Sequence, residues 1–470
     1  MAEFKLNPYR LFPSDPALRS TATHLYNQIK DLPIVSPHGH TDPSWFANNE
    51  PFANASDLLI KPDHYVFRML YSQGVALEDL GIPTIDGTET SKNDREIWRL
   101  FAKHYHLFAA TPSRMWLDHV FSEVFEFKVR LTPDTADFYF DTINEKLATE
   151  AFRPRALLER FNIELIATTE SPLDDLRHHK KIIADGLGRR VITAYRPDNV
   201  VDPDYEGFLD NLAQFSALTQ CNVETWQGYL QAHRVRRAFF KEMGATSTDH
   251  GHPCATTANL SQEECEALYQ KVRRGAHSPA EARLFRGQVL TEMAGMSIED
   301  GLVMQLHPGS FRNHNQFVFE RFGRDKGADI PEQTEYVRAL KPLLDRYGNS
   351  SNLTLILFTL DETSYSRELA TLAGHYPCLR LGPPWWFHDS PEGMRRFRQQ
   401  ATETAGIYNT AGFNDDTRAF LSIPARHDVA RRMDCVSLAE WVNDHRIELD
   451  EAEHLAYELT YGLVKKAYKL

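Results

Sequence analysis

The chain has few cysteines and no long apolar segment. Its 5 cysteines in 470 residues include no C-x-x-C pair, so neither a disulfide framework nor a thiolate zinc site is expected. The longest apolar stretch, residues 353–360, is far shorter than the roughly 20 residues of a membrane-spanning helix, and no run of signal-peptide type stands at the N-terminus. These absences predict a protein of a reducing compartment, the cytoplasm, with no membrane partner.

An excess of positive charge is absent as well. The chain has 52 Lys and Arg against 65 Asp and Glu, a formal net charge of −13. It therefore lacks the general cationic field that draws a protein to nucleic acid or anionic lipid. The basic runs at 177–181 and 234–237 contain no interleaved aromatic residues and are typical of exposed helix faces. A nucleic-acid partner is not expected.

Short apolar runs predict a parallel β-sheet. Runs such as 301–307 and 353–359 are nearly continuous in apolar residues, which is typical of parallel strands covered on both faces. Helix starts lie between the runs, because Ser261 with Glu264, and Ser278 with Glu281, form capping-box patterns. This alternation predicts an α/β fold, a (β/α)8 barrel of TIM type. Its strands would cover residues 32–38, 164–169, 190–196, 245–250, 301–307, 353–359, 379–386 and 410–416.

One segment departs from the strand and helix repeat. Residues 44–161 separate the first predicted strand from the second, and parts of the segment, such as 96–103 and 116–125, have apolar residues near helical spacing. No low-complexity linker or internal repeat divides the chain. We therefore predict a single domain over residues 1–470, with 44–161 as a helical insertion that caps the barrel.

Polar residues of catalytic type follow the predicted strands. His38 and His40 close the first strand, and residues two apart on a strand point to one face, so both imidazoles can reach one metal ion. His-x-His also occurs at 104–106, in a predicted helix, and at 250–252, so the strand-end position rather than the spacing favours the first pair. Other strand ends carry Arg196, Asp249, His307, Arg312, Trp385, Trp386, Asp416 and Arg418. Each of these residues, taken alone, could have a purely structural role. Their occurrence together at the ends of successive strands indicates an active site.

These motifs resemble the uronate isomerases, also called glucuronate isomerases, a branch of the amidohydrolase superfamily. The resemblance covers essentially the whole chain and lies in the order and spacing of several signatures. They are His38-Gly-His40, Asp63-His-Tyr-Val-Phe-Arg68, Thr168-Thr-Glu-Ser-Pro172, Tyr195-Arg-Pro-Asp198, Asp249-His-Gly251, Gln305-Leu-His-Pro-Gly-Ser-Phe-Arg312, Pro384-Trp-Trp386 and Asp416-Thr-Arg418. The resemblance implies a barrel of the amidohydrolase type.

The resemblance also implies an aldose–ketose isomerase that interconverts D-glucuronate with D-fructuronate, and D-galacturonate with D-tagaturonate, through a cis-enediol. The implied catalytic residues are Asp416, paired with Arg418, and the hydroxyl of Tyr65; which of Asp416 and Tyr65 removes the C2 proton stays open. Arg196 and Arg312 would hold the sugar carboxylate, because a guanidinium fork matches its two oxygens. The other implied substrate contacts are His64, His307, Trp385 and Trp386.

A divalent metal ion, most simply zinc, is implied with His38, His40 and Asp416 as ligands, and His307 beside them as a further ligand or a substrate contact. Moving a proton needs no metal-activated hydroxide, so the need for the ion is open. Two alternatives remain, a mononuclear zinc hydrolase of the same superfamily and a non-catalytic sugar-acid binding protein. The preferred uronate, the role of Asp249 and the oligomeric state are also open, although the family commonly self-associates and we expect a homo-oligomer.

Overall fold

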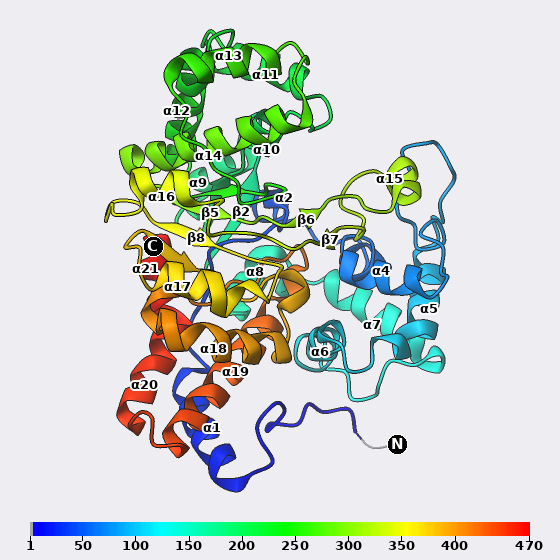
Figure 1. The fold of residues 1–470 in the computed structure, drawn as a ribbon. Helices are drawn as coiled ribbons and strands as arrows, with labels where there is room; N and C mark the ends of the chain where they lie inside the picture. Colours follow the sequence, from blue (N-terminus) through cyan, green and yellow to red (C-terminus); the bar gives the residue numbers. More distant parts are fainter. Residues whose placement is uncertain (1–2) are drawn as a thin grey trace.

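The centre of the computed structural model, which describes residues 3–470, is a curled sheet of parallel strands (Figure 1). Neighbouring strands follow the order β1 (Ile34–Ser36), β2 (Ile163–Glu170), β3 (Val191–Tyr195), β4 (Ser247–His250), β5 (Val303–Leu306), β8 (Leu355–Leu357) and β9 (Leu379–Leu381). Each strand lies within or across one of the predicted runs. The prediction of a mixed α/β fold around a parallel sheet is confirmed; β2 is longer than its predicted run and the other strands are shorter.

The last predicted run, residues 410–416, forms no strand of its own. Its only bridge joins Thr410 in parallel to Leu381 of β9, and at the opposite edge of the sheet the His40 amide donates to the Thr417 carbonyl over 3.0 Å. The run ends in Asn414, Asp415 and Asp416, residue types that are depleted in strands. The structure therefore shows seven strands of this sheet and corrects the eighth to an irregular segment between β9 and β1.

The predicted capping boxes begin two helices. The Ser261 hydroxyl accepts from the Glu264 amide at 3.3 Å while the Glu264 carboxylate accepts from the Ser261 amide at 2.8 Å, which starts α13 (Gln262–Val272). Ser278 and Glu281 do the same for α14 (Pro279–Asp300). The other helices outside the cap are α1 (Pro16–Ile29), α9 (Arg177–Ala184), α10 (Asp198–Val201), α11 (Phe208–Thr219), α12 (Trp226–Glu242), α16 (Lys341–Tyr347), α17 (Ala370–Ala373), α18 (Pro391–Ala405), α19 (Ile423–Asn443), α20 (Leu449–Tyr457) and α21 (Leu463–Tyr468). None of the helices in residues 3–470 has both the length and the apolar character needed to span a bilayer.

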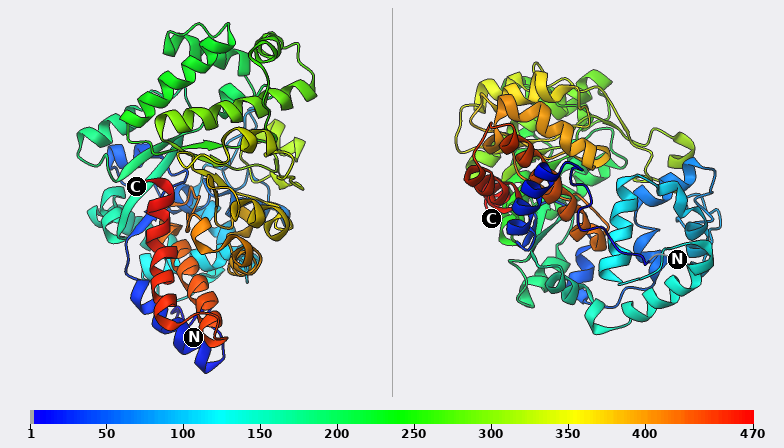
Figure 2. Two further views of the ribbon diagram at one scale, coloured as in Figure 1. Left: turned by 60° about the vertical axis from the view of Figure 1, so that its left-hand side comes forward. Right: turned by 90° about the horizontal axis from the view of Figure 1, so that it is seen from below.

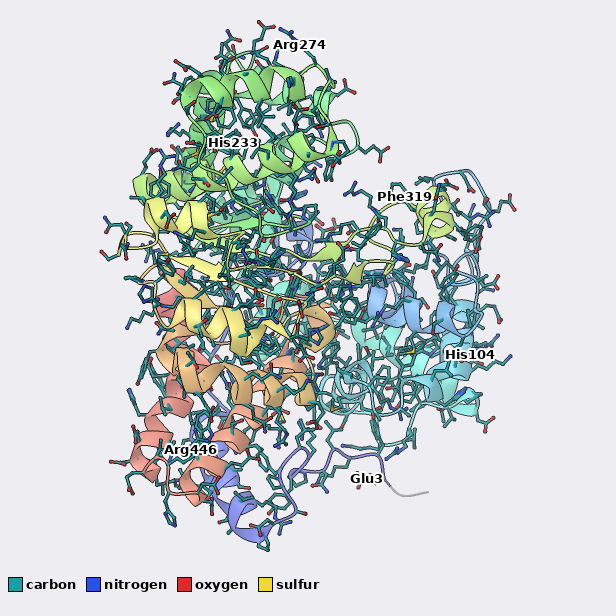
Figure 3. The ribbon with its side chains drawn as sticks, viewed as in Figure 1. Glu3, His104, His233, Arg274, Phe319 and Arg446 are labelled. Atoms are coloured by element: carbon teal, nitrogen blue, oxygen red, sulfur yellow. The ribbon has the colours of Figure 1, made fainter. Side chains whose placement is uncertain are left out.

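The segment between β1 and β2 contains helices and no strand in the structure. These are α2 (Pro43–Asn48), α3 (Ala55–Leu59), α4 (His64–Ser72), α5 (Asp94–His104), α6 (Pro112–His119), α7 (Ala136–Leu147) and α8 (Pro154–Arg160). Helices α4 to α7 lie together beside the sheet (Figures 1 and 2), and His104 lies on their side remote from the strands (Figure 3). Trp98 and Phe101 of this group share one apolar cluster with Ile163 and Ile166 of β2, so the cap is packed onto the sheet.

A second elaboration was not predicted. Between β5 and β8 the chain forms β6 (Ser310–Phe311), α15 (Gln316–Phe322) and β7 (Ile330–Pro331), and β6 pairs with β7 in antiparallel fashion. We call residues 310–331 the excursion. It reaches the cap, where the Ile85 amide donates to the Arg321 carbonyl at 2.8 Å and the Arg321 guanidinium pairs with Glu78 at 2.8 Å.

Candidate active site

The residues predicted for the site line one cavity of about 320 Å³. It lies where the carboxyl ends of the strands meet α4 and the excursion. Among its lining residues are His38, His40, His64, Tyr65, Arg196, His307, Arg312, Trp385, Trp386, Asp416 and Arg418. The structure thus brings together every side chain that the sequence singled out for metal binding, substrate binding or catalysis, although its geometry alone does not assign these roles.

The imidazoles of His38 and His40 both lie against one carboxylate oxygen, Oδ1 of Asp416. The Nε2 atoms of His38 and His40 lie 3.3 and 3.1 Å from Oδ1 of Asp416, yet this buried oxygen has no hydrogen-bond partner of acceptable geometry. Nitrogen and carboxylate atoms that crowd together without hydrogen bonds are what a divalent metal site requires. Two groups of side chains have candidate ligand atoms within 4.8 Å of one another: His38 with His307 and Asp416, and His38 with His40 and Asp249. The residues present therefore fit a divalent ion, without fixing which one.

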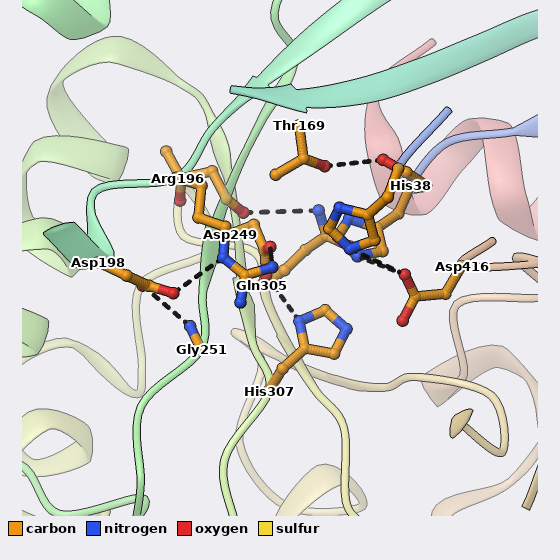
Figure 4. Close-up of polar contacts among 12 residues, drawn as sticks. His38, Thr169, Arg196, Asp198, Asp249, Gly251, Gln305, His307 and Asp416 are labelled. Atoms are coloured by element: carbon orange, nitrogen blue, oxygen red, sulfur yellow. Dashed lines mark hydrogen bonds and ion pairs between the residues drawn. The ribbon is translucent and has the colours of Figure 1, made fainter. Parts of the chain in front are cut away.

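The backbone at Asp416 supports a functional rather than a packing role. Asp416 has φ of 39° and Trp386 has φ of 54°, both in the left-handed region that side-chain-bearing residues seldom adopt. Such conformations cost of order 1–3 kcal/mol and cluster at functional sites. The strained turn directs the Asp416 carboxylate toward the histidines that follow β1 (Figure 4).

Asp249 at the end of β4 fixes two of the predicted residues. Its Oδ1 lies 2.7 Å from Nδ1 of His307, and its Oδ2 lies 3.0 Å from Nη1 of Arg196 (Figure 4). Burial opposes ionisation of Asp249, but Arg196 and His307 outweigh it and hold its pKa well below the usual value. An ionised carboxylate only accepts hydrogen bonds, so Nδ1 of His307 must donate. Its buried Nε2 has no hydrogen-bond partner among the described residues and can then act as an acceptor or metal ligand.

Asp198 completes the support of Arg196. Its Oδ2 accepts from Nε of Arg196 at 2.8 Å, and its Oδ1 accepts from the Gly251 amide at 3.1 Å. A Cβ atom at position 251 would lie 2.3 Å from Nη2 of Arg196, which explains the glycine after Asp249 and His250. The Arg196 guanidinium is held in one orientation before any ligand arrives.

Tyr65 enters the cavity from the first turn of α4, whose N-cap Asp63 accepts from the Tyr65 amide at 2.8 Å. Its ring stacks on His64 with 4.7 Å between centroids, and the guanidinium carbon of Arg68, three residues further along α4, lies 5.7 Å from its centre. Burial raises the pKa of Tyr65 well above its usual value, so the hydroxyl keeps its proton. Burial, reinforced by Arg418 and Arg68, lowers the pKa of His64 to about 3 and leaves that ring neutral.

The comparisons with known proteins agree with this geometry. A family model described as glucuronate isomerase matches residues 16–468. The chain belongs to the glucuronate isomerase family. It is 66% identical to the uronate isomerase of Sphingopyxis alaskensis over 99% of both chains, and 64% identical to that of Phenylobacterium zucineum over 99% of this chain and 97% of the relative. The crystal structure of glucuronate isomerase from Caulobacter crescentus superposes with a TM-score of 0.98 at 61% identity, covering 99% of this chain and 97% of that chain.

One expected pairing of the isomerase site is wrong. Asp416 was predicted to pair with Arg418, but the Arg418 guanidinium lies against Asp325 of the excursion, with 3.4 Å between Nη2 and Oδ2. Asp416 turns instead to His38 and His40. Burial opposes ionisation of Asp416, but these two histidines hold its pKa well below the usual value. The carboxylate is therefore kept ionised by imidazoles and not by a guanidinium.

The excursion also supplies cavity residues that the sequence did not indicate. Arg312 was predicted, and its Nη1 donates to Asp329 at 2.8 Å while its guanidinium lies 5.4 Å from the Trp386 ring. Arg324 was missed; it lies 4.3 Å from the ring centre of Tyr205 and has no ion pair within residues 3–470. Asp325 was missed too. Neither residue follows a predicted strand, so no periodic or spacing signal could have identified it.

Proposed function

We propose that the protein is an aldose–ketose isomerase that interconverts D-glucuronate with D-fructuronate and D-galacturonate with D-tagaturonate. One observation carries the proposal: an ionised carboxylate, Asp416, and a protonated phenol, Tyr65, line the same cavity as Arg196 and Arg312. Membership of the glucuronate isomerase family decides between isomerisation and the hydrolase or binding alternatives, since the cavity alone does not.

The two protonation states suggest which group takes which proton. Asp416 removes the proton from C2 of the open-chain sugar, while the O–H bond of Tyr65 breaks and its proton passes to the carbonyl oxygen on C1. The product of this step is a cis-enediol. The enediol hydroxyl on C2 then returns its proton to the Tyr65 oxygen as Asp416 delivers the carried proton to C1. No proton is consumed, and general acid–base transfer of this kind contributes roughly 10²–10⁴-fold to a rate.

The remaining cavity residues bind and orient the sugar acid. Arg196 and Arg312 offer guanidinium groups whose parallel N–H bonds fit the C6 carboxylate, and both are already oriented by Asp249 and Asp329. Trp385 packs on His307, with 4.7 Å between ring centroids, and can cover a sugar face. The buried indole Nε1 of Trp386 and Nε2 of His64 have no protein partner, so they are free to contact sugar hydroxyls.

We assign His38, His40 and Asp416 as the residues that would hold a divalent ion, zinc being the ion expected from the family resemblance. When bound, the ion would act as a Lewis acid that orients and polarises substrate oxygens. The proton transfers described above are made by side chains of the chain itself.

An isomerisation assay with both uronates, run with and without a chelator, tests the function. Conversion of both uronates to their ketoses is the expected result, and the chelator arm shows whether an ion is needed. If the uronates were converted no faster than in the absence of the protein, at every pH and with every metal ion added, the proposal would be refuted. Hydrolase activity in its place would restore the zinc hydrolase alternative.

We also propose that residues 410–416, although irregular, close the sheet in the eighth strand position of a single-domain barrel with the cap inserted at 44–161. The Ala411 amide donates to the Leu381 carbonyl at 2.8 Å, and the Thr417 carbonyl accepts from His40 at 3.0 Å, so hydrogen bonds reach both edges of the sheet. Amide exchange at Ala411 and His40 as slow as that within β9 is expected, and fast exchange would contradict closure. The expected homo-oligomer can be checked by light scattering of the purified chain.

A further inference from the structure

A buried ionic cluster packs against Tyr65, and its charged residues are not among those that line the cavity. Its centre is Arg426 of α19, which is 1% exposed. Nη1 of Arg426 donates to Oδ2 of Asp389 at 2.6 Å, and Nε donates to the Ser422 hydroxyl at 3.1 Å. The guanidinium carbon lies 3.5 Å from the ring centre of Trp116 and 5.3 Å from that of Tyr65. The positive charge is therefore held directly against the predicted proton donor.

The hydrogen bonding of this cluster is incomplete. Nη2 of Arg426 and Oδ1 of Asp389 are buried and have no hydrogen-bond partner within residues 3–470. Buried guanidinium groups that serve only as anchors are normally satisfied. Arg237 of α12, 0% exposed, is such a case, because its Nε and Nη2 donate to Asp300 and its Nη1 lies 3.7 Å from the sulfur of Met293. Arg286, Arg398 and Arg431 also have a buried guanidinium nitrogen with no partner within residues 3–470, so what distinguishes Arg426 is its contact with Tyr65 and Trp116.

Tyr65 is the group that such a charge would affect. Its ring also packs edge-on against Trp116, at 5.5 Å and 87°, so Trp116 contacts both Tyr65 and Arg426. When the hydroxyl gives up its proton, negative charge develops on a buried oxygen. The charges acting there are Arg426, which favours the anion, and Asp389, Asp416 and Asp63, which oppose it. A fixed positive charge in a buried site stabilises such a charge strongly because the local dielectric is low.

We propose that Arg426 is a positioning residue for the isomerisation, holding Tyr65 through Trp116 and stabilising the negative charge that develops on the Tyr65 oxygen during proton transfer. This inference rests on the proposed function. Arg426 touches no substrate in this account; it acts through Tyr65 alone.

A double-mutant cycle with Tyr65→Phe tests the inference. Arg426→Met should lower kcat about 10- to 100-fold and change KM less than about 3-fold, because a transition-state charge is lost and no substrate contact is. Arg426→Lys, which keeps the charge, should recover most of kcat. In the Tyr65→Phe background, the further cost of Arg426→Met should be less than about 2-fold, because coupled residues are not additive. Equal costs in both backgrounds would show a merely structural role and overturn the inference.

Two further variants guard against misfolding. Arg426→Met with Asp389→Asn removes both charges, which leaves no unpaired buried carboxylate, and should still lower kcat, but less than Arg426→Met does because Asp389 opposes the Tyr65 anion; wild-type kcat in this folded double variant would overturn the inference. Arg237→Met, the matched buried arginine, should lower the thermal midpoint but keep kcat. The wild-type and Tyr65→Phe chains separate the two proposals. If the wild type does not turn over uronates, the proposed function fails. If Tyr65→Phe keeps full activity, the proposed role of Tyr65 in proton transfer fails.

Discussion

The two halves of the cavity differ in how firmly their charged groups are held. At the strand ends, Asp249 is 0% exposed and His307 3% exposed, and their atoms lie 2.7 Å apart. On the opposite side, Asp325 of the excursion is 54% exposed and Arg418 37% exposed, at 3.4 Å. Exposed pairs contribute little and rearrange cheaply, whereas buried, oriented groups are preorganised for chemistry. We therefore expect activity to be more sensitive to changes at the buried strand-end groups than at the exposed Asp325–Arg418 pair.

The largest effect should come from the strand-end carboxylate. Asp416→Asn keeps the shape but removes the charge that takes the C2 proton, and we expect kcat to fall by about 10³-fold or more. Initial rates with D-glucuronate measure the loss, and circular dichroism checks that the fold is kept. A folded Asp416→Asn chain within 10-fold of the wild type would remove Asp416 from the chemistry.

A smaller loss of activity is expected from a change at Arg196, the strand-end arginine proposed to bind the sugar carboxylate. Arg196→Lys keeps the charge but loses the fork that Asp198 and Asp249 orient, so kcat/KM for uronates should fall by about 100-fold. Neutral aldohexoses, which lack the C6 carboxylate, should be affected far less. Equal losses for both substrate classes would exclude the carboxylate role.

Glu170, at the end of β2, allows the burial of charged groups at the strand ends to be tested through the pH dependence of the unfolding free energy. Burial raises its pKa from 4.5 to about 8, so between these values the unfolded chain binds fewer protons than the folded one and stability falls as pH rises. Glu170→Gln lacks this dependence, and should gain on the order of 3 kcal/mol relative to the wild type on going from pH 5 to pH 8. Denaturant unfolding across this range measures it. Parallel stability curves for the two chains would contradict a buried, protonated Glu170.

The smallest effect is expected on the excursion. Asp325→Asn makes the same chemical change as Asp416→Asn but at a loose, exposed pair, and should alter kcat/KM by less than about 5-fold. The two variants assayed together test the comparison directly. If Asp325→Asn proved as damaging as Asp416→Asn, the excursion would belong to the catalytic machinery and the contrast between the halves would be lost.

The sequence predicted the parts of the molecule that depend on local pattern. Continuous apolar runs located the parallel strands, and Ser261 and Ser278 marked real helix starts. Strand-end positions identified His38, Arg196 and Asp416 as neighbours in space, because parallel strands all end at one side of a sheet. These patterns involve residues close together in the sequence, so they can be read without knowing the tertiary contacts.

The remaining features depend on tertiary partners. Asp416 and Arg418 are two positions apart in the sequence, yet the backbone turns at Asp416, with φ in the left-handed region, and Arg418 pairs with Asp325 instead. The last strand was overpredicted because hydrogen bonding at its edge depends on β9 and on the chain after β1. Arg426 gave no signal either, since a charged residue in a helix is usually exposed. Only packing against Trp116 and Tyr65 shows its importance.

The most direct test of the account is to incubate D-glucuronate with the wild-type and Asp416→Asn chains in D2O and follow C1 and C2 by NMR. We expect the wild type to convert D-glucuronate to the ketose and to introduce solvent deuterium at the carbon-bound positions. Conversion and deuterium exchange should both be suppressed in Asp416→Asn. A wild-type chain that neither converts the uronate nor exchanges its C2 proton above the blank would contradict it, as would a variant that does both at the wild-type rate.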